Sequence, residues 1–381
     1  MDMAFTLEES EIKNQVRKFV KKDLLPVYRE VDEKGDLFGD VKEKFQSMNL
    51  LKIYFPEEYG GVGGTFVGLI IALKELGYGS IIPTTLLTGN SLVAWSLYNY
   101  GSDFLKTTYI PDLLSLKIPA GIAFTESDTG SDPKQLKTVA KKRAGGWLLN
   151  GSKKFITNSG TGGYLMLFAL TDEGVTAFWV NSKHTDYKVG KRESFIHCGP
   201  LDNGELYLDD YFVPEDHVIG QVNKGFEILV RAEAIGKTGF CAGYVGLAER
   251  ALDLAVKYAN TRTHRGKPIG RKFQMIQVKL ARMTTRVAAM NSYLYQVAAM
   301  VDQGKNFVPD AARLKLLVAE DVKEITADAM EIHGAYGLSD EYEIGALFKA
   351  GIGVQVIMGA SDIQRVIIAN DILAKGRYDT E

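Results

Sequence analysis

The hydrophobic pattern changes character twice along the chain. In the first third, from Leu7 onward, apolar residues recur every three to four positions, as amphipathic helices require. The middle segment consists of short runs rich in β-branched and aromatic residues with turn residues between them, a pattern typical of strands. From about Phe226 the helical period returns. We therefore expect three domains: an N-terminal helical domain at 1–116, a central β-domain at 117–225 and a C-terminal helical bundle at 226–381.

The last domain shows the helical period most clearly. One stretch, QMIQVKLARMTTRVAAMNSYLYQVAAMVDQG, places apolar side chains on a single face, namely Ile276, Leu280, Met283, Val287, Met290, Leu294 and Val297. The next stretch, DAARLKLLVAEDVKEITADAMEIHG, begins at Pro309-Asp310, a helix start pattern. Both stretches should form long helices that bury one face.

A turn near the C-terminus looks suited to meet a ligand. In VIMGASDIQR, from Val356 to Arg365, small residues lead into a helix that we expect Ser361 to cap, so backbone N–H groups face outward. The residue at the tip of the turn is Met358, whose thioether can neither accept nor donate a proton. The identity of that residue therefore needs an explanation.

Composition favours small-molecule chemistry. The chain has 381 residues, is 46% hydrophobic and carries a net charge of −2 with both signs mixed, so it lacks the basic surface that nucleic acid or an anionic membrane would require. The N-terminus has no apolar signal region, and no apolar run approaches the roughly 20 residues of a membrane span, so a cytoplasmic protein is expected. Cys198 and Cys241 lack a CxxC spacing, which gives no indication of a disulfide framework or a metal site; both should be buried thiols.

Five stretches together identify a family resemblance. They are FPEEYGGVGG, AFTESDTGSD, NGSKKFITNSG, TRTHRGKPIGRKFQ and GASDIQR, and they occur in the order found in acyl-CoA dehydrogenases. The chain resembles this family of flavoproteins over nearly its full length. The resemblance implies an α+β multidomain fold, with an N-terminal helical domain, a central β-barrel, a C-terminal four-helix bundle and FAD between barrel and bundle. It also implies a homotetramer, a dimer of dimers, that passes electrons to an electron-transfer flavoprotein.

The resemblance assigns FAD contacts to individual residues. In the β-domain, Phe155 stands where the family often has a Trp against the flavin, and Thr157 matches a hydroxyl that bonds near N5. Taken alone, Phe155 would be an ordinary core aromatic. Arg262 matches an arginine that reaches the pyrophosphate of a neighbouring subunit's FAD, although a lone arginine at a helix end is usually solvated. The other implied FAD-binding residues are Phe124, Thr125, Gly130, Ser131, Gln274, Glu331, Gly334 and Ser361.

The chain departs from the family at the pyrophosphate end. Arg265 occupies the place of a usual Phe, and one extra residue lies between Ile269 and Phe273. Glu331 stands where a Gln normally contacts FAD, and a carboxylate near a pyrophosphate is unfavourable unless Arg265 or Arg262 compensates. We expect retained FAD binding with a rebuilt pyrophosphate end; weakened or lost flavin binding is the alternative.

The catalytic base is missing from both places where the family carries it. The family reaction removes a proton from the carbon α to the thioester while hydride leaves the β carbon, so it requires a carboxylate opposite the flavin. One branch places this Glu at the position of Met358, and another at the position of Gly236. Glu233 lies three residues before Gly236, on nearly the same face if this stretch is helical, and is the candidate replacement.

Other interpretations of Glu233 remain open. It is equally consistent with a solvated helix carboxylate or a partner of Arg231 or Lys237. Asp371 and Glu331 are weaker candidates for the base. Relatives that form cyclic dienes take an acid from the first domain, but the corresponding helix TTLLTGNSLVAW offers no carboxylate.

The segments that handle CoA also differ from the family. Ala234 and Lys237 replace the usual Asp and Arg, and the family's RDAK segment is Lys-Ala-Gly-Ile at 349–352.

Three hypotheses follow. The first is a dehydrogenase of an acyl thioester with a displaced base, acting on a cyclic or conjugated acyl group. The second is a flavoenzyme of the same fold with other chemistry: a desulfinase, an oxygenase or a dehydrogenase of a carrier-protein thioester. The third is a non-catalytic subunit paired with a base-bearing homologue.

Overall fold

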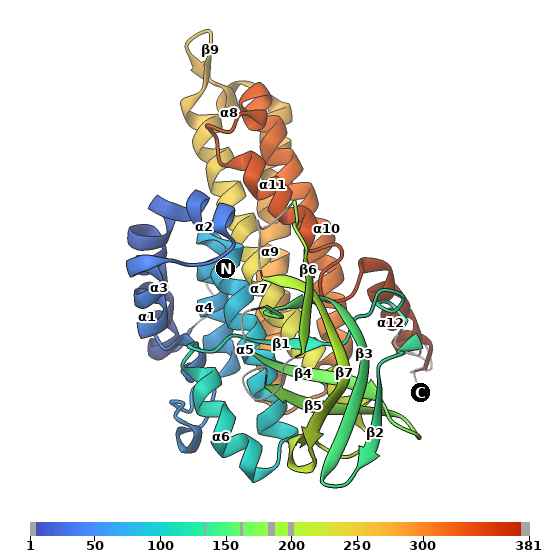
Figure 1. Cartoon of the computed structure of the whole chain (residues 1–381). Coiled ribbons are helices and arrows are strands. Elements are labelled where there is room, and N and C mark those ends of the chain that lie inside the picture. The colour runs from blue at the N-terminus through green and yellow to red at the C-terminus, as the bar shows by residue number, and fades with distance from the viewer. Residues whose placement is uncertain (1–4, 133–134, 161–162, 182–186, 197–201, 375–381) are drawn as a thin grey trace, which may run out of the picture.

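The computed structural model describes residues 5–132, 135–160, 163–181, 187–196 and 202–374. Figure 1 shows two helical regions with a sheet on one side. Of the two cysteines, Cys241 is a free, buried thiol as expected, and Cys198 lies outside the described residues. Within the described ranges, no helix is both long enough and apolar enough to cross a membrane.

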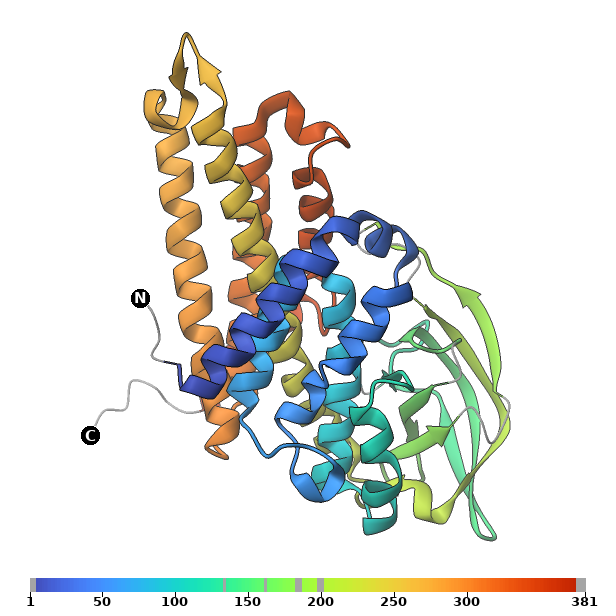
Figure 2. The same ribbon diagram turned by 90° about the vertical axis from the view of Figure 1, so that its left-hand side faces the viewer.

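The N-terminal region is helical, as the pattern predicts. Thr6 and Glu9 form a reciprocal capping box that begins the first helix. The fourth and fifth helices are almost completely buried because they lie between the outer helices and the C-terminal bundle (Figure 2). The helices are α1 (Leu7–Phe19), α2 (Tyr28–Lys34), α3 (Gly39–Ser47), α4 (Phe66–Gly79), α5 (Ile81–Tyr100) and α6 (Asp103–Leu114).

The middle segment forms one mostly antiparallel sheet. Its order is β6-β7-β3-β2-β4-β5-β8, and β1 adds to β4 in parallel. The expected closed barrel is wrong for the described strands, because β6 and β8 end the ladder without pairing with each other. The strand β8 has only two residues, too few to extend the ladder further. The strands are β1 (Ala120–Ala123), β2 (Val139–Arg143), β3 (Gly146–Thr157), β4 (Tyr164–Leu170), β5 (Val175–Asn181), β6 (Lys188–Arg192), β7 (Asn203–Pro214) and β8 (Val218–Ile219).

The C-terminal region is a bundle of long helices that extends beyond the sheet (Figure 1). Of the predicted apolar stripe, Met283 to Val297 are buried, whereas Ile276 and Leu280 near the start of the helix are only partly covered. The elements are α7 (Gly225–Thr261), a hairpin of β9 (Thr263–His264) and β10 (Lys267–Pro268), α8 (Ile269–Lys272), α9 (Gln274–Asp302), α10 (Val308–His333), α11 (Ile344–Gly353) and α12 (Ser361–Ala374).

The two helical regions share one hydrophobic core, and the sheet has a second core of its own. The helix α7 runs through the centre, packed by α4 and α5 on one side and α10 on the other. The loop between α11 and α12 meets α7 at Gly236, in the first half of that helix. This meeting point places the turn that contains Met358 against the long central helix.

Candidate active site

The turn before α12 has an unusual backbone. Met358 has φ +55° and Gly359 has φ +85°, so both lie in the left-handed region. Glycine adopts this region freely, but a side chain such as methionine does so at a cost. The surrounding structure must therefore hold Met358 in place, as is common at functional sites.

Met358 and Gly236 meet directly. A Cβ atom built on Gly236 would lie 2.4 Å from Cε of Met358 and 3.0 Å from Cδ2 of Leu92. The two positions that the resemblance assigns to the base, far apart in sequence, therefore face the same small space. A thioether fills that space here.

Glu233 is held in an ion pair. Its Oε2 accepts a hydrogen bond from Nζ of Lys237 at 3.0 Å, one helical turn further along α7. The Lys237 side chain is only 7% exposed and that of Glu233 is 31% exposed. Of the interpretations that the sequence left open, the partnership with Lys237 is the contact found, whereas Arg231 lies over the ring of Trp95.

The weaker candidates for the base are also paired. Asp371 accepts a hydrogen bond from Arg313 at 2.5 Å. Glu331 pairs with Lys279 of α9, so the cation that compensates Glu331 within the chain is Lys279, and not Arg265 or Arg262 as expected. Glu331 also lies roughly 24 Å along α10 from the level of Lys315, at 1.5 Å per residue.

Ser361 faces the interior. Its hydroxyl donates to the carbonyl of Gln355 at 3.2 Å, and Lys315 Nζ donates to the hydroxyl oxygen at 3.4 Å. The predicted side-chain cap of α12 is therefore not the contact found. At the start of α12, the backbone N–H groups of Ile363 and Gln364 donate to the carbonyl of Ala360, and that of Ser361 donates to the carbonyl of Gln355.

On the sheet, Phe155 presents an aromatic face outward. It lies in an irregular part of β3 opposite β7, has φ +59° and is 49% exposed, so it is not the ordinary core aromatic that it resembles in isolation. Thr157 accepts a hydrogen bond from Nδ2 of Asn203 at 3.1 Å, which leaves its own proton free to donate. The buried Oδ1 of Asn203 has no partner among the described residues. An exposed ring beside a hydroxyl donor and an unpaired acceptor fits the edge and face of a flavin.

A buried ion pair supports the loop after β1. Lys153 Nζ donates to Oε1 of Glu126 at 2.8 Å and to the carbonyl of Phe124 at 3.1 Å. Burial lowers the pKa of Lys153 to about 8, with Glu126 acting in the opposite direction. The ring of Phe124 packs against Phe168 in the core, so only the backbone of Phe124 remains to face a ligand. In the remainder of the loop, Thr125 is half-buried, and Gly130 and Ser131 are exposed.

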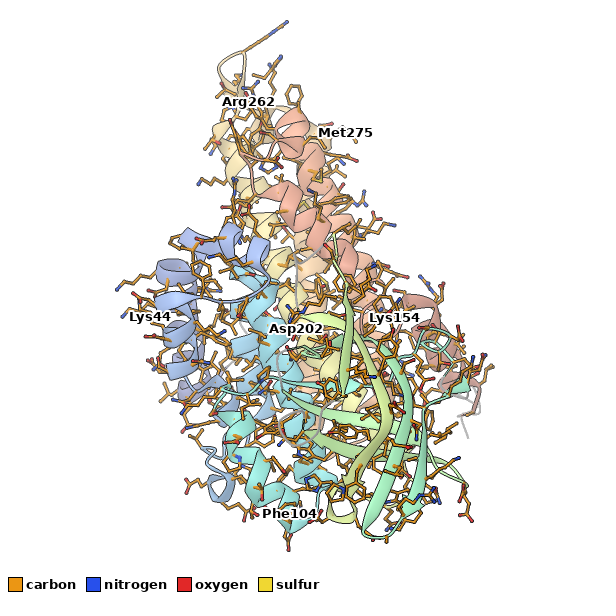
Figure 3. The ribbon with its side chains drawn as sticks, in the orientation of Figure 1. Lys44, Phe104, Lys154, Asp202, Arg262 and Met275 are labelled. Carbon is orange, nitrogen blue, oxygen red and sulfur yellow. The ribbon has the colours of Figure 1, made fainter. Side chains whose placement is uncertain are left out.

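The remaining predicted FAD contacts lie at the far end of the bundle. Figure 3 shows Arg262 near the distal tip, whereas Lys154 lies on the sheet. Arg262 ends α7, roughly 39 Å along the helix from Gly236, and its guanidinium lies over the ring of Tyr336. Gln274 begins α9 and Gly334 ends α10 at the same end of the bundle. The structure therefore brings most of the predicted contacts together as two separate groups, one on the sheet and one at the tip, whereas Ser361 belongs to α12.

Sequence reasoning missed four residues that shape these sites: Glu126, Lys153, Asn203 and Lys315. Their roles depend on contacts between segments that are distant in the sequence. Lysines that stand within apolar runs were the visible indication of such contacts in the sequence. In the described part of the chain, no group of three or more His, Cys, Asp or Glu side chains is arranged to hold a metal ion.

Comparison with known families matches almost the whole chain. The acyl-CoA dehydrogenase N-terminal domain matches residues 6–117, the middle domain 121–211 and the C-terminal domain 223–373. Among curated relatives, an acyl-CoA dehydrogenase of Bacillus subtilis is 34% identical, with 97% of this chain and 99% of the relative covered. The acryloyl-CoA reductase (NADH) of Anaerotignum propionicum is 32% identical (98% and 97% covered). A caffeyl-CoA reductase-Etf complex subunit, CarC of Acetobacterium woodii, is 30% identical (98% and 100%).

Solved structures agree with this assignment. Butyryl-CoA dehydrogenase from Megasphaera elsdenii superposes with a TM-score of 0.93 at 30% identity, covering 98% of this chain and 100% of that one. The FAD complex of PigA gives 0.92 at 26% identity (99% and 100%), and the prolyl acyl carrier protein oxidase AnaB gives 0.90 at 28% (97% and 100%). The chain therefore belongs to the acyl-CoA dehydrogenase family, whose members are FAD-dependent oxidoreductases that act on CH–CH groups.

Proposed function

We propose that this protein oxidises or reduces an acyl thioester without a carboxylate base at either position usual for the family. The contact between Met358 Cε and the Cβ position of Gly236 carries the proposal, because it places a thioether where a base would have to reach the substrate. FAD, when bound, exchanges hydride with the β carbon of the acyl group. Phe155 and Thr157 would hold the flavin face and edge, and the loop of Thr125, Gly130 and Ser131 would hold its outer parts.

Glu233 is the proposed proton carrier. It is the partly exposed member of an ion pair on α7, one turn before Gly236. Its carboxylate can act as a base only if Lys237 releases it, which a substrate carbonyl or anion could bring about by binding the ammonium. A cyclic or conjugated acyl group, whose transferred proton leaves from a different carbon, fits a displaced base.

A carrier-protein thioester is the second candidate substrate. The position at which family members use an arginine for CoA is Lys237, which is buried and paired with Glu233 inside the protein. Ala234 is buried and offers no polar group. Since these residues do not present charges to a CoA nucleotide, a phosphopantetheine arm on a protein is an alternative carrier, and the similarity to AnaB supports this choice.

We further propose a homo-oligomer, a dimer of dimers, in which Arg262 and Gln274 serve a neighbour's FAD. Their distance from the sheet supports this arrangement, as does an exposed apolar side chain, Met275, which is 69% exposed beside them (Figure 3). An electron-transfer flavoprotein is the proposed electron partner, as the name of CarC suggests for that relative. We propose cytoplasmic action and functional domains at 1–116, 117–225 and 226–381.

An anaerobic titration tests the proposed function. FAD-loaded protein is mixed with saturated, unsaturated and cyclic acyl-CoA thioesters and with the same acyl groups on a phosphopantetheinylated carrier protein, and flavin absorbance is followed before and after reduction. We expect one class to change the flavin redox state, and Glu233→Gln to slow that change by about 10²-fold. The matched control is Glu227→Gln, an exposed carboxylate in the first turn of the same helix, which should have no effect. Failure of every thioester, with and without a homologous partner subunit, would refute the proposal.

A further inference from the structure

Lys315 is a buried ammonium for which the described part of the chain provides no counter-ion. It lies on α10, is 1% exposed and makes no ion pair among the residues that the structure describes. Its Nζ donates to the carbonyl of Gln355 at 3.2 Å and to Oγ of Ser361 at 3.4 Å. A buried charge that is held only by neutral groups is unfavourable. We therefore infer that the ammonium of Lys315 has a function in the protein.

Both acceptors of Lys315 belong to the loop that displays Met358. The carbonyl of Gln355 also accepts hydrogen bonds from the backbone N–H of Ser361 at 3.0 Å and from its hydroxyl at 3.2 Å, which closes the loop at its base. The side-chain amide of Gln355 donates to the carbonyl of Ala319, one turn after Lys315 on α10. The loop is therefore anchored to α10 at two neighbouring points, with Met358 at its tip.

The groups around Lys315 set its protonation. On α7 it faces Lys237, which is paired with Glu233, and the Cys241 thiol, whose pKa burial raises to about 12. On α12 it faces Arg365, whose partners are Glu320 and Asp362. Burial lowers the pKa of Lys315 to about 8, and the charges of Lys237 and Arg365 add to this shift. The thiol stays neutral where the amine titrates.

We propose that Lys315 is a positioning residue, whose ammonium anchors the Gln355–Ser361 loop to α10 and thereby fixes Met358 against Gly236. Only the statement that Met358 borders the substrate rests on the proposed function. A hydrogen bond from an ammonium is stronger than one from a neutral amine, so loss of the proton loosens the loop. Lys315 therefore couples pH to the shape of the site without touching the substrate.

Methyl NMR of FAD-loaded protein that carries ¹³C-methyl methionine tests this proposal directly. The Met358 resonance is assigned by its loss in Met358→Leu, and Met290, fully buried in α9, is the reference methyl. The Met358 methyl should shift with a midpoint near pH 8, and Met290 should not. In Lys315→Gln, which keeps a donor but cannot titrate, the shift should vanish. In Lys323→Gln, an exposed lysine on the same helix, it should persist.

The outcomes separate this proposal from the proposed function, because the NMR readout needs no turnover. A Met358 methyl that stays flat between about pH 7 and 9 overturns the positioning role, even if Lys315→Gln does not fold. A shift that persists in Lys315→Gln overturns it as well. If a thioester substrate is found, a break near pH 8 in the rate of flavin reduction, absent from Lys315→Gln, supports the role. If the Met358 methyl shifts with pH but no thioester reacts, the positioning role of Lys315 stands and only the proposed function is refuted.

Discussion

Gly236 and Met358 should be energetically coupled, and the strength of the coupling follows from their contact. In Gly236→Ala the new Cβ would lie 2.4 Å from Met358 Cε and 3.0 Å from Leu92 Cδ2, closer than side-chain atoms approach. Since Cε is the free end of a flexible side chain, moving Met358 aside should cost about 1 kcal/mol, the lower end of the range for overpacking. Replacing a glycine inside a helix recovers up to about 1 kcal/mol. The single variant should therefore lose less than about 1 kcal/mol.

The second half of a double-mutant cycle removes the Met358 side chain that the new Cβ would meet. Met358→Ala should destabilise the protein by less than the roughly 2–5 kcal/mol of a fully buried methionine, because Met358 is only partly buried. In this background, Gly236→Ala meets little resistance and should stabilise α7 by up to about 1 kcal/mol. The expected coupling between the two sites is about 1 kcal/mol.

Urea unfolding of the four FAD-loaded proteins, followed by tryptophan and flavin fluorescence at one protein concentration, gives the cycle. Because a protein of several domains need not unfold in two states, the comparison uses the transition that reports the flavin. A control pair, Gly236→Ala combined with Met290→Ala on α9, should show no coupling. If Gly236→Ala changed stability equally with and without Met358, the shared space between the two positions would be refuted.

Three further predictions concern the cofactor, the assembly and pH. Denaturation should release non-covalently bound FAD from protein made in flavin-replete cells, and absence of flavin in the supernatant would contradict the cofactor assignment. Arg262→Ala should weaken FAD binding in a sedimenting oligomer without changing flavin contacts on the sheet; a flavin-loaded monomer would contradict the shared site. Burial raises the pKa of Asp32 to about 6, opposed by the Ser80 hydroxyl and Arg250, so the folded state holds this proton more tightly than the unfolded chain. The stabilisation from this group is complete below about pH 4 and is lost as the pH rises through 6. Asp32→Asn should flatten that dependence in thermal unfolding.

The local pattern of hydrophobic and polar residues was enough to predict most helices and strands. The stripe from Met283 to Val297 is buried because an α-helix repeats every 3.6 residues and one face must meet the core. The middle segment became strands because its runs are rich in β-branched and aromatic residues, which favour extended backbone. The family motifs then predicted the approximate fold and the cofactor, since several short stretches in a fixed order specify a family better than any one of them.

Contacts between distant segments could not be predicted. Nothing local indicates that Met358 touches Gly236, because that contact depends on the path of the loop before α12. Ser361 looked like a helix cap, but its hydroxyl turned inward to Gln355. The closed barrel was expected from resemblance alone, and the length of β8 and the pairing of β6 decide the observed open ladder.

Proton exchange at the α carbon of a saturated acyl-CoA in heavy water, followed by mass spectrometry, tests most directly the claim that Met358 occupies the place of the base. The account predicts very slow exchange by the unmodified FAD-loaded protein and an acceleration of at least about 10²-fold in Met358→Glu. Poor solvation raises the pKa of the new carboxyl, and the nearby ammonium groups of Lys237 and Lys315 oppose that rise. Fast exchange by the unmodified protein that Glu233→Gln leaves unchanged, or no gain in Met358→Glu despite bound thioester, would contradict it.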